Sequence, residues 1–152
     1  MSDEQQETPL TDEELRIAID GRSTDWFLQK LVSLANTMGL SFGVTLFVEG
    51  VMISGMLVSG KRYFEAFADE FSSNYPGDDE AKEEVRGGIA SHTAIYAGDD
   101  SDNEPPPPQY IHLVDARCFA PGGQPIPTNR GVLWRGRINA VSGFNLGTLM
   151  TE

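Results

Sequence analysis

The chain has 152 residues, of which 39% are hydrophobic, with one cysteine and a formal net charge of −12. A single cysteine excludes an internal disulfide framework, and no apolar run approaches the ~20 residues of a membrane-spanning helix. The polar, acidic N-terminus has the features of neither a signal peptide nor a transit peptide, so we expect a cytoplasmic protein that does not associate with membranes.

The acidic residues are concentrated in two segments. Residues 1–20 carry a net charge of −6 and residues 65–104 carry −10, whereas the two remaining stretches each carry +2. We therefore predict an acidic, mostly disordered tail with one short helix over 1–20, followed by a single α+β domain over 21–152. An acidic and proline-rich insertion at about 76–108 interrupts this domain, because the sequence DDSDNEPPPP is typical of a solvated spacer.

Three helices are predicted from capping signals and apolar spacing. Thr11 to Glu14 has the form of a capping box, which predicts a short helix ending by Asp20. Apolar residues at three- and four-residue spacing predict a second helix over about 24–38, capped by Ser23 or Thr24. A third helix is predicted over about 61–73, with an aromatic stripe expected to pack in the core: Tyr63, Phe64, Phe67 and Phe71.

The insertion gives weaker signals. Residues 76–88 allow at most a short charged helix between glycines. Residues 89–97 fit either a strand or a helical turn.

Alternation with a period of two predicts a β-hairpin over 42–58, with its turn at Glu49-Gly50 and a bulge or bend at Gly55. Both faces of this hairpin are apolar, so the second face must be covered by a helix or by another chain. Its members are candidate partner-binding residues: Phe47, Met52, Met56 and Val58.

Three further strands are predicted over about 109–119, 131–141 and 144–150. Five strands with an N-terminal helix and a helix after the first hairpin favour one of two shapes. One is a small, strongly bent antiparallel sheet, and the other is an Sm-like barrel.

The sequence lacks the residues that an enzyme or a metal site needs. His112 and Cys118 share parity on one predicted strand but lie about 20 Å apart at strand rise, which is too far for a nucleophile pair. There is no CxxC, HExxH, EF-hand or phosphate-loop pattern. We therefore expect no enzymatic activity, no cofactor and no metal.

Arg135 and Arg137 face the same side of a predicted strand, with Trp134 on the other side, and all three are candidate partner-binding residues. The two arginines could bind phosphates or carboxylates. This gives an alternative function, an Sm-like nucleic-acid-binding or regulatory module, which rests on an analogy of fold alone. The net charge of −12 disfavours nucleic acid as a partner, because it repels a polyanion.

Two blocks of the chain, residues 25–67 and 110–147, carry distinctive elements in a fixed order. They are the hairpin with Gly50, Ser54-Gly55 and Ser59 that continues into Tyr63-Phe64, the strand Ile111-His112-Leu113, and Trp134-Arg135-Gly136 with Gly143-Phe144 and Gly147. Together the two blocks resemble the gas vesicle accessory protein GvpU family.

The resemblance implies an accessory, non-shell role in gas vesicles, which are hollow, protein-walled flotation organelles. It implies protein–protein binding in vesicle clustering or assembly, without catalysis or a cofactor. The expected partners are the shell or other gas vesicle proteins, with homo-oligomer formation left open. The expected location is the cytoplasm, in association with gas vesicles.

Overall fold

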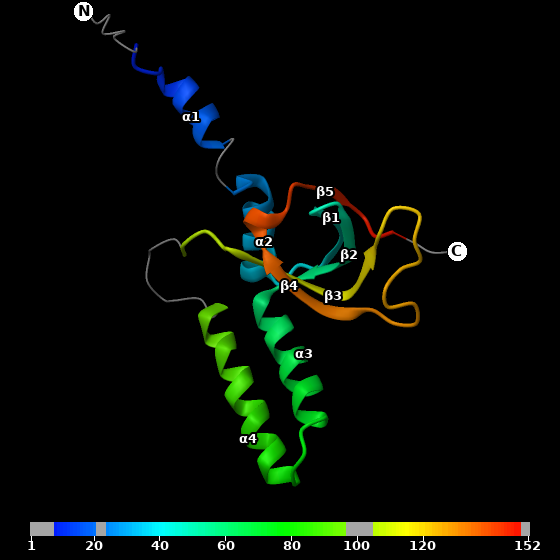
Figure 1. The fold of residues 1–152 in the computed structure, drawn as a ribbon. Coiled ribbons are helices and arrows are strands. Elements are labelled where there is room, and N and C mark those ends of the chain that lie inside the picture. Colours follow the sequence, from blue (N-terminus) through cyan, green and yellow to red (C-terminus); the bar gives the residue numbers. More distant parts are fainter. Residues whose placement is uncertain (1–7, 21–23, 97–104, 150–152) are drawn as a thin grey trace, which may run out of the picture.

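The computed structural model describes residues 8–20, 24–96 and 105–149 and confirms an α+β fold with five antiparallel strands (Figure 1). The elements, in chain order, are α1 (Asp12–Asp20), α2 (Trp26–Met38), β1 (Phe42–Val48), β2 (Val51–Val58), α3 (Gly60–Ser73), α4 (Asp79–Ala90), the 3₁₀ helix η1 (Ser91–Tyr96), β3 (Tyr110–Phe119), β4 (Val132–Arg137), the 3₁₀ helix η2 (Ile138–Ala140) and β5 (Gly143–Leu146).

Helix α1 begins with the predicted capping box. The Thr11 hydroxyl accepts a hydrogen bond from Glu14 N (3.2 Å), and the Glu14 carboxylate accepts one from Thr11 N (2.8 Å). The bonds that this carboxylate accepts from the Thr11 backbone N–H and from the Thr11 hydroxyl hold the pKa of Glu14 below its ordinary value. Figure 1 shows α1 standing away from the sheet, beyond the N-terminal end of α2.

Helix α2 covers one face of the sheet, and its cap differs from the expected one. Asp25 is the N-cap, because its Oδ1 accepts hydrogen bonds from Phe27 N (2.9 Å) and Leu28 N (3.2 Å). Of the two expected caps, Thr24 is not used and Ser23 lies outside the described residues. The helix ends at Gly39, whose φ of 67° favours glycine.

We expect Asp25→Ala to lower the free energy of unfolding by about 1 kcal/mol, because two amide groups at the start of α2 lose their acceptor. Chemical denaturation of both proteins would measure the difference. Thr24→Ala is the matched control and should leave the stability unchanged. A larger loss in Thr24→Ala than in Asp25→Ala would identify Thr24 as the cap instead.

The predicted hairpin is confirmed, with β1 paired to β2 from Phe42–Leu57 to Val48–Val51. Its two turn residues, Glu49 and Gly50, both have positive φ (50° and 81°), which suits the right-handed twist of a two-residue hairpin loop.

The sheet has the strand order β4-β3-β2-β1-β5 and is not closed, because no ladder joins its edge strands β4 and β5 within the described residues. A closed barrel is therefore not what the structure shows. The sheet is nevertheless curled (Figure 1). In a flat five-strand sheet the two edge strands, β4 and β5, would lie about 19 Å apart. Residues 138–142, which include η2 and connect β4 to β5, can span only about 16 Å. The sheet must therefore curl to bring its edges closer.

The strand predicted over 131–141 ends at Arg137, because residues 138–140 turn into η2. Ile138 N donates to Gln109 O (3.0 Å), and Ser142 N donates to Phe47 O (2.9 Å). The fully buried Ile138 thereby joins the core formed by α2 and the sheet. This connection fixes how far the two edges can separate.

A bulge in β3 changes which side chains share a face. The pairing of β2 with β3 shifts register between Ser54 and Met56, and the pairing of β3 with β4 shifts between Leu113 and Ala116. Both shifts leave one extra residue in β3 at Asp115, whose φ is 51°. The irregularity expected at Gly55 is present, but the extra residue belongs to the neighbouring strand.

The bulge reverses the parity of β3 beyond Asp115. Ala116 belongs to the core on the α2 side of the sheet and Cys118 packs against it, whereas His112 contacts the ring of Tyr63 from α3. The expectation that His112 and Cys118 share a face is therefore wrong.

Residues 76–96 are folded. Helix α4 runs through Gly87 and Gly88, is longer than expected, and packs beside α3 to form a helical hairpin that projects from the sheet (Figure 1). Arg86 Nε bonds to Asp69 Oδ1 (2.6 Å) and links the two helices. The segment that fitted either a strand or a helical turn forms the end of α4 and then η1. Residues 97–104 of the predicted insertion lie outside the described residues.

Candidate protein-binding surface

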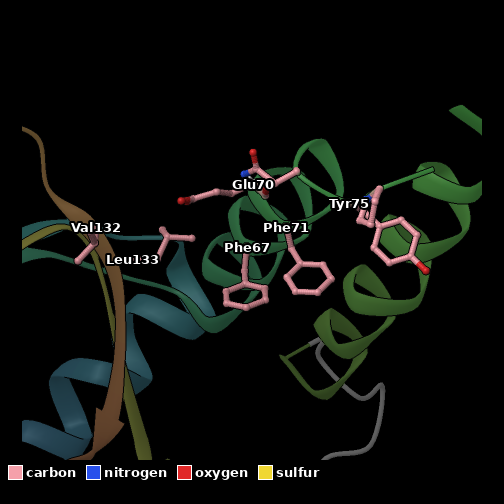
Figure 2. A pocket seen from close by; sticks show the side chains of 8 residues that line it. Phe67, Glu70, Phe71, Tyr75, Val132 and Leu133 are labelled. Atoms are coloured by element: carbon pink, nitrogen blue, oxygen red, sulfur yellow. Dashed lines mark hydrogen bonds between the residues drawn. The ribbon is translucent and has the colours of Figure 1, made fainter. Parts of the chain in front are cut away.

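A groove of about 370 Å³ lies between the C-terminal half of α3 and the beginning of β4. Figure 2 shows the rings of Phe67 and Phe71 along α3, with Leu133 and Val132 of β4 across from them. The residues that line the groove are Phe67, Glu70, Phe71, Asn74, Tyr75, Pro76, Val132 and Leu133.

The groove exposes large apolar side chains. Phe71 is 48% exposed and Val132 is 46% exposed. The rings of Phe67 and Phe71 stack, with centroids 6.0 Å apart. Exposed apolar groups that gather around a concave site are typical of a surface that binds another protein.

The aromatic stripe of α3 is therefore divided between two roles. Tyr63, near the N-terminus of the helix, is buried as expected. One to two turns later, Phe67 and Phe71 pass beyond the sheet's cover and border the groove. The expectation that the whole stripe packs in the core is wrong for these two residues.

Arg135 and Arg137 lie on the same face of β4 and flank one aromatic ring. The guanidinium carbon of Arg135 is 3.6 Å from the centroid of Tyr110, and that of Arg137 is 5.8 Å from it. Both arginines are exposed, and neither forms an ion pair within the described part of the chain. They provide an ordered pair of positive charges along β4, on the side of the groove away from the start of that strand.

A smaller polar cavity of about 210 Å³ adjoins Arg137. It is lined by Gln109, Tyr110, Arg137 and Asn139. Its side chains carry hydrogen-bond donors that suit a carboxylate.

Arg135 also supports a buried imidazole. Arg135 Nε–H donates to His112 Nε2 (3.2 Å), and the fully buried His112 ring lies 4.7 Å from Tyr63 and 5.7 Å from Tyr96 between ring centroids. Burial, and secondly the charge of Arg135, lower the pKa of His112 to about 4. The imidazole is therefore neutral at pH 7 and fastens α3 and η1 to the sheet.

The chain itself covers much of the hairpin's second face. Val58 is fully buried and so cannot contact a partner in this conformation, whereas Phe47, Met52 and Met56 are half-buried. Near the C-terminus, Leu149 N donates to Ser54 Oγ (2.7 Å), which lies on the same face. A segment of the chain itself therefore covers part of the hairpin face for which another chain was one of the two expected covers.

Trp134 is half-buried against the core on the opposite face, where its ring packs on Gly136. Among the seven candidate residues, the structure leaves Arg135 and Arg137 exposed, further along β4 than the groove residues Val132 and Leu133. Sequence reasoning missed the groove residues as a binding surface. The spacing of Phe67, Phe71 and Tyr75 at every fourth residue was the available signal.

Within the described residues, no group of three or more histidine, cysteine, aspartate or glutamate side chains could hold a metal ion. None of the helices described is both long and apolar enough to cross a membrane.

A family model described as gas vesicle protein GvpU-like matches residues 25–149, which is most of the chain and includes α2, α3 and all five strands. Helix α1 lies outside the match. Comparison with curated proteins and comparison with solved structures each give no significant match.

Proposed function

The chain belongs to the gas vesicle protein GvpU-like family, and from this premise we propose that it is an accessory, non-shell protein that acts by binding other proteins in vesicle clustering or assembly. It works in the cytoplasm on the vesicle surface. It carries out no catalysis and uses no cofactor.

The groove between α3 and β4 is the observation that supports a binding role. Contact with an apolar or amphipathic segment of a partner would bury the groove's exposed rings and so favour binding. Arg135 and Arg137 would attract acidic residues of the same segment. Phe47, Met52 and Met56, being half-buried, contribute a lesser contact area.

The nucleic-acid alternative has less support. Arg135 and Arg137 supply two positive charges, whereas a nucleic-acid-binding surface usually neutralises several phosphates. The adjacent groove contains Glu70, whose charge repels a phosphate backbone. Single-strand binders place exposed aromatic rings among basic residues, whereas the charged residues of α3 around Phe67 and Phe71 are Glu65, Asp69 and Glu70.

We expect Phe71→Asp to abolish co-flotation of the protein with gas vesicles, because a carboxylate in an apolar contact loses its hydration without a partner. Vesicles would be floated by centrifugation from cells whose own copy of the gene is deleted, and the bound protein measured by immunoblot. Phe71 is half-exposed, so the variant should fold, which circular dichroism would verify.

Ile95→Asp is the matched control, because Ile95 is also exposed but does not line the groove. It should float with vesicles as the wild type does. The proposal fails if the wild-type chain never floats with vesicles. It fails for the groove if Phe71→Asp floats normally.

A further inference from the structure

Within the described residues, no other helix or strand packs against α1 closely enough to bury its apolar side chains. It has nine residues, and isolated helices shorter than about 12–15 residues are marginal in water. Its apolar side chains are exposed, by 47% for Leu15 and 53% for Ile19. A short helix with exposed aliphatic groups is stabilised when those groups pack on another surface.

The residues of α1 are divided along its length. The first turn is acidic, with Asp12, Glu13 and Glu14. Leu15 and Ile19, four residues apart, then form an apolar stripe. Ile17 lies on the opposite face, since successive helical residues rotate by about 100°.

The surface along β4 is also divided into an apolar part and a charged part, and its charge is opposite to that of α1. Leu133, Arg135 and Arg137 alternate along one face of the strand, so an apolar end at the groove is followed by two positive charges. Leu133 and Arg137 are separated by about 13 Å at strand rise. Asp12 and Ile19 are separated by about 10 Å at helical rise. Read antiparallel to β4, the acidic and apolar parts of α1 therefore have the same order as the basic and apolar parts of this surface, and the two separations agree to within about 3 Å.

We propose that α1 of one copy docks in the groove of a second copy, antiparallel to β4. Leu15 and Ile19 pack against Phe71 and Leu133, and the acidic first turn faces Arg135 and Arg137. Arg16, which flanks the apolar stripe, faces Glu70 on α3.

The occupant comes from a second copy because α1 of the same copy projects from the far end of α2, away from the helical hairpin (Figure 1). Each copy then offers one helix and one groove on different surfaces. Such a head-to-tail contact builds open chains unless the rotation closes a ring. The inference rests on the proposed function, since it names the partner of the same groove.

The test uses full-length variants in sedimentation velocity over a range of protein concentrations. The wild type should associate as concentration rises. Leu15→Asp/Ile19→Asp should raise the dissociation constant by about 100-fold or more, because two aliphatic contacts are lost. Phe71→Asp should have a similar effect. Ile17→Asp is the matched control and should associate like the wild type.

Mixing the two deficient proteins is the decisive measurement. The α1 variant keeps an intact groove, and the groove variant keeps an intact α1, so an equimolar mixture should form a one-to-one heterodimer while each protein alone stays monomeric. A mixture that stays monomeric overturns the proposal. A wild type that remains monomeric, or an Ile17→Asp variant as impaired as Leu15→Asp/Ile19→Asp, overturns it too.

The charge alignment is tested by Arg137→Glu, which should weaken association about tenfold, and by its recovery when Asp12→Lys is present on the partner copy. An unchanged dissociation constant in Arg137→Glu overturns the alignment.

Failure of this docking inference is distinguishable from failure of the proposed function. If the α1 variant self-associates normally while Phe71→Asp no longer floats with vesicles, the groove binds another protein and only the docking inference fails.

Discussion

Replacing Gly131 by alanine is expected to lower the free energy of unfolding by about 2–3 kcal/mol. Gly131 lies against the bulge of β3, and a Cβ there would come closer than 3.0 Å to backbone atoms of Asp115. Backbone cannot rotate away as a side chain can. Asp115 also accepts a hydrogen bond from Gly131 N (3.1 Å), so moving Gly131 weakens the contact that fixes the bulge.

Urea denaturation of the variant and the wild type would measure this loss. Gly123→Ala is the matched control, because its Cβ would meet only ordinary contacts with Ala120 and should change the stability by less than about 0.5 kcal/mol. A Gly131→Ala protein as stable as the control would mean that the bulge can shift at little cost.

Acidification is expected to remove about 3 kcal/mol of stability through His112 alone. The ordinary pKa of 6.5 applies in the unfolded chain, whereas burial and Arg135 lower the folded pKa to about 4. Between pH 6.5 and about 4, His112 is protonated in the unfolded chain but stays neutral in the folded protein. Stability is therefore complete above pH 6.5, falls as the pH drops towards about 4, and changes no further through this group below it.

Urea denaturation at several pH values between 7.5 and 4 would test this effect against His112→Gln, which cannot titrate and keeps an acceptor for Arg135. Every other ionisable side chain is the same in both proteins, so the difference between the two slopes isolates His112. Equal slopes in the wild type and the variant would show that the imidazole does not contribute.

The elements set by neighbouring residues were predictable from the sequence. The capping box at Thr11, the turn at Glu49-Gly50 and the start of α3 all depend on groups within a few positions of one another. The five-strand α+β fold also followed from the alternation of apolar residues.

Features that depend on distant contacts were not predictable. The bulge at Asp115 requires a non-glycine residue with positive φ, and its preference arises from Gly131, sixteen positions away. Since that one residue reverses the parity of the rest of β3, the predicted partnership of His112 and Cys118 failed with it. Helix α4 passes through two glycines because packing beside α3 outweighs their poor helix propensity.

The candidate surface was predictable in its charged part only. Arg135 and Arg137 were identified by alternation along β4, which is a local property. Whether Phe67 or Tyr63 of one stripe is buried depends on how far the sheet extends beneath α3. Alternation likewise could not show that Val58 lies in the interior. The binding role of the remaining candidates stays a prediction.

The position of β5 bears on how the protein is made. Strand β5 pairs with β1, and Thr45 Oγ1 donates to Gly147 O (2.9 Å), a contact between residues 102 positions apart. During synthesis, β1 therefore keeps an open edge until β5, about a hundred positions later in the chain, has been translated. Open strand edges recruit other chains. A chain truncated after β4 would leave this edge unpaired, so β5 protects the protein from aggregation through β1.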